Sequence, residues 1–169
     1  MIAYDDLIFE PFCADDIQLF TQIMTRSFDE DAKRHLNVSR GGPPGYDNGD
    51  FLRKWALDEG SQAMKVLKDG CPIGLFIVWI CENGENFLGN LFVDSDVQDK
   101  GIGTEIWKFI ESHYAGTKIW RTETPGFSKR NHHFYVNKCG FSIFKIENCG
   151  HRMQENYLME KRMDRVAMG

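Results

Sequence analysis

The sequence predicts one domain of the mixed α/β class, in which a mostly antiparallel, seven-stranded sheet carries helices on both faces. Its length of 169 residues fits a single domain spanning residues 1–169. The middle of the chain reads as three apolar strands joined by tight turns, which is typical of an antiparallel meander. The last third alternates strand and helix patterns, so a strand–helix–strand crossover follows the meander. The predicted order is therefore β α α β β β α β α β β.

The N-terminal part predicts a strand, a helix, a long loop and a second helix. Residues 7–12 read as the strand, and Asp15 or Asp16 can cap the first helix with a side-chain oxygen. The apolar positions of this helix fall on one face, at Ile17, Phe20, Met24 and Phe28. Glycine and proline dominate residues 39–49, which predicts a loop, and residues 50–58 follow as the second helix.

The rest of the chain supplies six strands and two helices. The three strands of the meander cover residues 62–67, 71–81 and 85–93, separated by Asp-Gly and Asn-Gly turns. A helix over 101–114 and a strand over 118–122 come next. Ser128 is predicted to cap a short helix over 129–138, which Gly140 ends in a left-handed conformation. The final strands are predicted at 141–146 and 157–163.

The overall charge and hydropathy exclude several classes of protein. The net charge of −5 and the pI near 5.5 argue against a global nucleic-acid-binding surface. The longest apolar stretch, residues 73–81, is too short to span a bilayer, and the N-terminus lacks the features of a signal peptide. We therefore expect a cytoplasmic protein with neither a membrane nor a nucleic-acid partner.

The cysteines predict neither disulfides nor a metal site. There are five, and no two have CxxC spacing, so in a reducing compartment we expect free thiols that are mostly small buried side chains. No pair of ligands has the spacing of a zinc finger among the candidates His132, His133, Cys139, Cys149 and His151. The expected metal content is none.

Charge is distributed unevenly along the chain. Residues 1–50 hold four basic and ten acidic residues, a balance of −6, whereas residues 118–169 hold ten and five, a balance of +5. This asymmetry suits a protein that faces a cation on one side and an anion on the other. Ordinary solvated surface explains it as well.

The segment 90–104 predicts an anion-binding helix start. A strand ends at Val93, a short loop follows, and the helix opens at Gly101, where unpaired N–H groups and the helix dipole favour an anion. Gly101 and Gly103 lack Cβ atoms that would keep a phosphate from the backbone, and Lys100 adds a positive charge. A Walker A loop is absent, and a Rossmann fingerprint would need a glycine at position 106, which is isoleucine. A plain tight turn into a helix remains the alternative.

The same residues resemble the acetyl-CoA signature of the GNAT superfamily of N-acetyltransferases, whose core is Gln/Arg-x-x-Gly-x-Gly/Ala. The chain has Gln98-Asp99-Lys100-Gly101-Ile102-Gly103 at this point. Phe134-Tyr135 with Gly140-Phe141 resembles the family's second motif, and the predicted order of elements is also the family's. The resemblance covers nearly the whole chain and implies a GNAT-like fold without a metal.

The resemblance implies a site for acetyl-CoA between two splayed strands. Backbone groups of the strand Leu91-Phe92-Val93 would bind the pantetheine arm and supply an oxyanion donor. The residues implied to hold the cofactor are Leu91, Phe92, Val93, Gln98, Asp99, Lys100, Gly101, Ile102, Gly103, Thr104 and Asn131.

The resemblance implies that Tyr135, the tyrosine on the helix before Gly140-Phe141, is the catalytic residue, and a phenol can protonate the departing thiolate. In the commonest family form three residues separate this tyrosine from the glycine, whereas here Val136 to Cys139 make four. Either a π-bulge or the loop absorbs the extra residue, or Tyr135 points elsewhere and Val136 takes its place. The general base stays open among Glu85, Glu123, His132 and His133.

The acceptor is expected beside the loop of residues 29–50, where acidic side chains and Tyr46 suit a cationic amine. The resemblance implies an N-acetyltransferase that acts on a primary amine, either a small molecule or a peptide, through a tetrahedral intermediate. A GNAT-like module that binds CoA or an acyl-CoA with little catalysis is the alternative. The sequence leaves a homodimer open.

Overall fold

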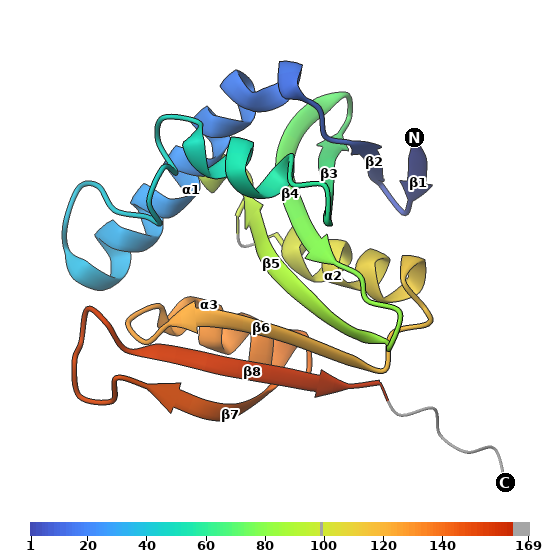
Figure 1. The fold of residues 1–169 in the computed structure, drawn as a ribbon. Helices are drawn as coiled ribbons and strands as arrows, with labels where there is room; N and C mark the ends of the chain where they lie inside the picture. Colours follow the sequence, from blue (N-terminus) through green and yellow to red (C-terminus); the bar gives the residue numbers. More distant parts are fainter. Residues whose placement is uncertain (99, 164–169) are drawn as a thin grey trace, which may run out of the picture.

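The computed structural model describes residues 1–98 and 100–163, in which one sheet contains eight strands in the order β1-β2-β3-β4-β5-β6-β8-β7 (Figure 1). All neighbouring strands are antiparallel except β5 and β6. The strands are β1 (Ile2–Tyr4), β2 (Leu7–Pro11), β3 (Ser61–Lys68), β4 (Cys71–Trp79), β5 (Glu85–Val93), β6 (Ile119–Pro125), β7 (Ser142–Glu147) and β8 (Asn156–Arg162). The mixed, mostly antiparallel fold class is confirmed, with eight strands in place of the predicted seven.

The additional strand is β1, which forms a short hairpin with β2. Its three residues are too few to show an alternating pattern in the sequence. Asp5 turns the chain with a φ of 49°, so that Ile2 pairs with Phe9.

Helices cover both faces of the sheet. The main helices are α1 (Ile17–Leu36), α2 (Ile102–His113) and α3 (Lys129–His133). Alternate residues of β4 enter two separate cores: Leu75 and Ile77 pack with α1, whereas Phe76 and Val78 pack with α2. Burial on both faces explains why this strand reads as a continuous apolar run.

Two predicted helices contain π-helical turns. The predicted helix at 50–58 contains the π-helical segment Leu52–Ala56, and the predicted helix at 129–138 is α3 followed by the π-helical segment Phe134–Lys138. Gly140 has the predicted left-handed conformation, with a φ of 84°.

The predicted side-chain caps were wrong. Asp16 precedes α1, but its carboxylate accepts the N–H of Cys13 at 2.9 Å and pairs with Lys65 at 3.0 Å. Ser128 precedes α3, but its hydroxyl donates to Asp31 at 2.9 Å. In both cases a partner distant in sequence attracts the side chain that would otherwise cap the helix.

The expectation of mostly buried cysteines was also wrong. All five are free thiols, but only Cys139 is buried, and the other four are exposed in turns and at strand ends. Within the described residues, no helix combines the length and apolar character needed to cross a membrane. Residues 1–98 and 100–163 also contain no group of three His, Cys, Asp or Glu side chains placed to hold a metal ion.

Candidate functional site

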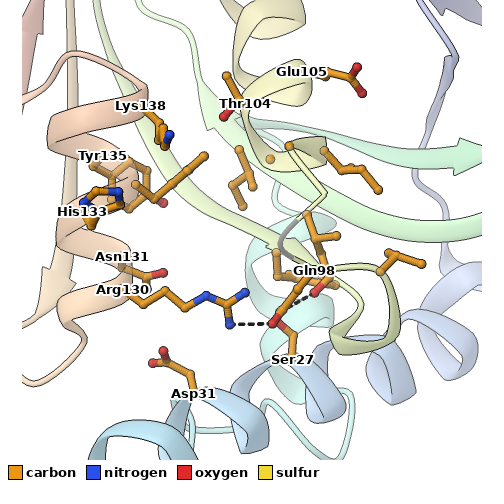
Figure 2. Close-up of a pocket in the computed structure, with 18 of the residues that line it drawn as sticks. Ser27, Asp31, Gln98, Thr104, Glu105, Arg130, Asn131, His133, Tyr135 and Lys138 are labelled. Atoms are coloured by element: carbon orange, nitrogen blue, oxygen red, sulfur yellow. Dashed lines mark hydrogen bonds between the residues drawn. The ribbon is translucent and has the colours of Figure 1, made fainter.

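A cavity of about 620 Å³ lies between the end of β5, the start of α2, α3 with its π-helical turn, and α1 (Figure 2). Ten of the residues predicted for the site line it: Leu91, Phe92, Val93, Gln98, Gly101, Ile102, Gly103, Thr104, Asn131 and Tyr135. Lys100 is exposed and is not part of this lining, and Asp99 lies outside the described residues. The structure therefore brings together segments that are up to 44 residues apart, from position 91 to position 135.

Divergence of β5 and β6 opens this cavity. The two strands pair over three residues only, from Glu85 opposite Ile119 to Phe87 opposite Arg121. The hydroxyl of Thr122 then donates to the carbonyl of Leu88 at 2.9 Å, and beyond it the strands separate (Figure 1). Because β5 stays paired with β4 as far as Val93, the end of β5 remains part of the sheet. The edge of β5 that does not pair with β4 faces the gap between β5 and β6.

The start of α2 contributes backbone N–H groups to the cavity wall. Gly101 precedes the helix with a φ of 78°, a left-handed conformation that favours glycine. The next three N–H groups, of Ile102, Gly103 and Thr104, begin the helix and have no preceding turn to donate to. Gly103 has a different reason for being glycine, because a Cβ there would lie 3.1 Å from the ring of Phe134. This helix start is suited to an anion.

Gln98 connects three elements around the cavity. Its amide nitrogen donates to the carbonyl of Val93 at 2.8 Å and to the hydroxyl of Ser27 on α1 at 3.2 Å. Its amide oxygen accepts from Arg130 of α3 at 2.6 Å, and Figure 2 shows these contacts crossing the lower part of the cavity. The Gln98 side chain thus fixes the loop before α2 against α1 and α3.

Tyr135 lines the cavity from the π-helical turn. It is only 6% exposed, and its ring packs edge-on against Phe141 with centroids 5.6 Å apart. Burial raises the pKa of Tyr135 well above its ordinary value, and contact with Thr122 opposes this only in part. The phenol therefore keeps its proton at neutral pH. The neighbouring Val136 packs against the core and is not among the lining residues.

Asn131 lies one turn before Tyr135, on the same wall of the cavity (Figure 2). Its amide nitrogen donates to the hydroxyl of Thr124 at 3.4 Å, and Thr124 on β6 is only 2% exposed. This contact holds Asn131 against the strand that diverges from β5.

The four candidate bases have different surroundings. Glu85 pairs with Arg121 at 3.4 Å, and Glu123 accepts from Asn156 at 3.2 Å; neither lines the cavity. His132 stacks on Tyr157, and burial lowers its pKa. His133 does line the cavity, and its Nδ1 lies 2.7 Å from the side-chain amide of Asn137.

In the acidic loop beside α1, which was expected to face the acceptor, most polar groups bond within the loop. Tyr46 is buried and donates to Asp29 at 2.6 Å. Asp47 pairs with Arg40, and Asp50 pairs with Arg53. Of the five acidic residues between positions 29 and 50, Asp31 is the one that lines the cavity, together with Ser27 and Phe28 of the same helix.

Other lining residues were not identified from the sequence as parts of a site: Ser27, Phe28, Val97, Glu105, Lys108, Arg130 and Lys138. Helical spacing offers a signal for only some of them, since positions 27, 28 and 31 share one face of a helix. Lys108 and Lys138 add two positive charges to the lining, and Glu105 adds one negative charge.

A comparison with protein-family models identifies a family for this chain. A sequence model described as the acetyltransferase (GNAT) family matches residues 20–141. The uncharacterized protein YrkN from Bacillus subtilis is 41% identical over 93 residues, which cover 54% of this chain and 50% of that protein. The match thus spans about half the length of this curated relative.

Solved acetyltransferases share the fold at low identity. An acetyltransferase from Thermus thermophilus is 15% identical and superposes with a TM-score of 0.73 over 96% of this chain and 100% of its own. The PaiA N-acetyltransferase from Thermoplasma acidophilum, solved in complex with coenzyme A, is 14% identical with a TM-score of 0.72 over 92% of this chain and 98% of its own.

Proposed function

The chain belongs to the acetyltransferase (GNAT) family, and from this membership we propose that it transfers an acetyl group from acetyl-CoA to a primary amine. The observation that carries the proposal is the cavity in which the open edge of β5, the start of α2 and the buried Tyr135 meet. An acyl-CoA donor has an anionic end and an extended arm that ends in a thioester. The cavity offers a counterpart to each of these parts.

The anionic end of acetyl-CoA would bind at the start of α2. The N–H groups of Ile102, Gly103 and Thr104 would donate to phosphate oxygens, and the positive end of the helix dipole favours these anions. Lys108 and Lys138 line the same cavity and add positive charge. Gly101 allows the tight entry into this helix without a side chain in the way.

The pantetheine arm would lie along the open edge of β5. Its amide groups can bond to backbone groups of Leu91 and Val93 as an added strand would. The thioester carbonyl would then lie near a backbone N–H of this strand, which can stabilise an oxyanion. Asn131, which also lines the cavity, would contact the arm.

The reaction is a direct transfer. The lone pair of the neutral amine forms a C–N bond to the thioester carbonyl carbon, and the carbonyl oxygen takes up negative charge in a tetrahedral intermediate. The C–S bond then breaks, and the CoA thiolate receives the proton of Tyr135. The nitrogen, which gained a positive charge on attack, loses its extra proton to solvent as the amide forms, and solvent returns a proton to the Tyr135 phenolate. The acceptor nitrogen must lose its proton before attack, because an alkylammonium has no lone pair.

Two measurements test the proposal. Calorimetry should show binding of acetyl-CoA, with ATP and NAD bound weakly or not at all. A panel of primary amines, assayed by release of the free CoA thiol, should contain substrates. Tight binding of ATP with no response to acetyl-CoA would refute the donor assignment. Binding of acetyl-CoA without acetylation of any amine would instead indicate a CoA-binding module.

A pair of variants at Gly101 separates charge from backbone strain. Gly101→Ala and Gly101→Asp both place a side chain on a residue with positive φ, where no atom of the described residues beyond its chain neighbours lies within 4 Å of the added Cβ. Only the aspartate puts a negative charge beside the proposed phosphate site. We expect Gly101→Asp to abolish acetyl-CoA binding and Gly101→Ala to retain most of it.

A further inference from the structure

Asp31 is a carboxylate that α1 presents to the cavity. It lies one helical turn after Ser27, so both side chains point from the same face of α1 (Figure 2). Its side chain is only 17% exposed. It is therefore a charged group placed inside the site, in contrast to the loop carboxylates that bond within their own loop.

The orientation of Asp31 is fixed from the other side of the cavity. The hydroxyl of Ser128, which is 1% exposed, donates to its two oxygens at 3.2 and 2.9 Å. The Nε2 atom of His35, one turn further along α1, lies 3.4 Å from the same carboxylate and also accepts the backbone N–H of Arg130. Because a hydroxyl is neutral, the Ser128 contact orients the carboxylate without removing its charge.

Arg130 lies between Asp31 and Tyr135 in Figure 2, and its guanidinium reaches across to Gln98. Asp31 is thus on the α1 side of this bridge, whereas Tyr135 and the start of α2 are on the other side. A carboxylate that bound the reacting nitrogen would hold it as ammonium and raise its pKa, which opposes attack on the thioester. A carboxylate set apart from the reacting nitrogen has no such cost.

We propose that Asp31 binds a second positive charge of the acceptor, so that the substrate class is an amine with another cationic group a few carbon atoms from the reacting nitrogen. This inference rests on the proposed acetyl transfer and specifies its acceptor. Asp31 acts in it as a specificity-determining residue and takes no part in proton transfer to the thiolate.

The test compares two acceptors of equal length, diaminobutane and pentylamine, which differ only in having an ammonium or a methyl group at the far end. We expect kcat/KM for diaminobutane to be about 10- to 100-fold higher, the ordinary worth of a hydrogen bond to a charged group. Asp31→Asn should remove this preference by raising KM for diaminobutane, because the amide can still accept from Ser128 but carries no charge.

Glu30→Gln is the matched control, since Glu30 lies beside Asp31 on α1, pairs with Arg34 and does not line the cavity. It should keep the preference for diaminobutane. The KM for acetyl-CoA and the thermal midpoint should stay unchanged in both variants, which separates lost recognition from misfolding. Added salt should raise the wild-type KM for diaminobutane but not that for pentylamine.

Equal kcat/KM for the two acceptors, or equal losses for both in Asp31→Asn, would overturn the inference and leave acetyl transfer standing. If no amine is acetylated, calorimetry of diaminobutane with the protein–CoA complex decides the matter without turnover. Binding that Asp31→Asn abolishes and Glu30→Gln retains would uphold the Asp31 site although the proposed function had failed. The inference about Asp31 would be overturned if diaminobutane did not bind the wild-type complex, or if it bound equally to Asp31→Asn and Glu30→Gln.

Discussion

The backbone N–H of Cys139 donates to the carbonyl of Phe134, five residues earlier, at 3.0 Å. An α-helix would place this bond four residues back, so the turn holds one extra residue. The extra residue is the one that separates Tyr135 from Gly140 beyond the common family spacing. Because the π-helical turn absorbs it after Tyr135, the tyrosine keeps its place in the cavity wall and Val136 does not replace it.

Tyr135→Phe should lower kcat for amine acetylation by about 10- to 1000-fold, because the departing thiolate loses its proton donor and water replaces it only partly. The affinity for acetyl-CoA should change little, since the ring and its packing remain. Single-turnover rates and calorimetry measure the two quantities. Tyr4→Phe removes the same atom on β1, outside the cavity, and should leave both unchanged. An unchanged chemical rate in Tyr135→Phe would leave Tyr135 with a packing role only.

Most of the fold could be predicted because its signals are local. The meander follows from alternating and continuous apolar runs between Asp-Gly and Asn-Gly turns, and the helix at 102–113 follows from its apolar spacing. The hairpin strand Ile2–Tyr4 was missed because three residues carry no period. The caps at Asp16 and Ser128 were misassigned because Lys65 and Asp31, at 49 and 97 residues' separation, compete for those side chains.

The site could be predicted only where a motif marks it. The loop of Gln98 to Gly103 and the Phe134-Tyr135 pair are contiguous patterns, and the structure places Gln98, Gly101, Ile102 and Gly103 of the loop around one cavity with that pair. The sequence does not show that the side chain of Gln98 contacts Arg130 and Ser27, since those partners belong to other helices. It also gives no means of selecting Asp31 from the other acidic residues of its region, because the selection depends on which carboxylates bond within the loop.

Cys139 should be the slowest of the five thiols to react with an alkylating reagent at neutral pH. It is 2% exposed, and burial raises the pKa of its thiol to about 12, so both access and the thiolate fraction are low. The other four cysteines are exposed and should react first. Mass spectrometry of native and denatured protein resolves the sites. Labelling of Cys139 at the rate of the exposed thiols would show that the π-helical turn opens readily.

Ionisation of Tyr114 should lower the unfolding free energy of the protein in alkaline solution. Burial raises its pKa from 10.0 to about 12, so the unfolded chain releases this proton at a lower pH than the folded protein does. The folded state therefore binds more protons between these values, and the stability that is intact below pH 10 declines as pH rises toward 12, by about 1–2 kcal/mol. Urea unfolding of wild type and Tyr114→Phe at several pH values measures it.

The difference in unfolding free energy between wild type and Tyr114→Phe should stay constant up to about pH 10 and then shrink, because only the wild type has the Tyr114 proton to lose. Tyr114→Phe also loses the hydrogen bond from the Tyr114 hydroxyl to Gln62. This loss lowers the unfolding free energy by the same amount at every pH below about 10, so it does not affect how the difference changes with pH. A difference that remains constant to pH 12 would show that the Tyr114 pKa is not raised by folding.

Gly74→Ala should destabilise the protein by about 1–3 kcal/mol, the usual cost of overpacking a core. An added Cβ would lie 2.5 Å from the carbonyl oxygen of Phe92, which is backbone and cannot rotate away. Gly74 pairs with Val93, so the strain falls on the end of β5 that lines the cavity, and the KM for acetyl-CoA should rise as well. Gly116→Ala is the control, because beyond its chain neighbours no atom in the described part of the chain lies within 4 Å of its added Cβ, and it should change stability by less than about 0.5 kcal/mol. Denaturant midpoints of Gly74→Ala, Gly116→Ala and wild type measure the two changes in stability. Equal stability would mean that β5 moves freely away from β4, and the end of β5 would then be too mobile to position a pantetheine arm.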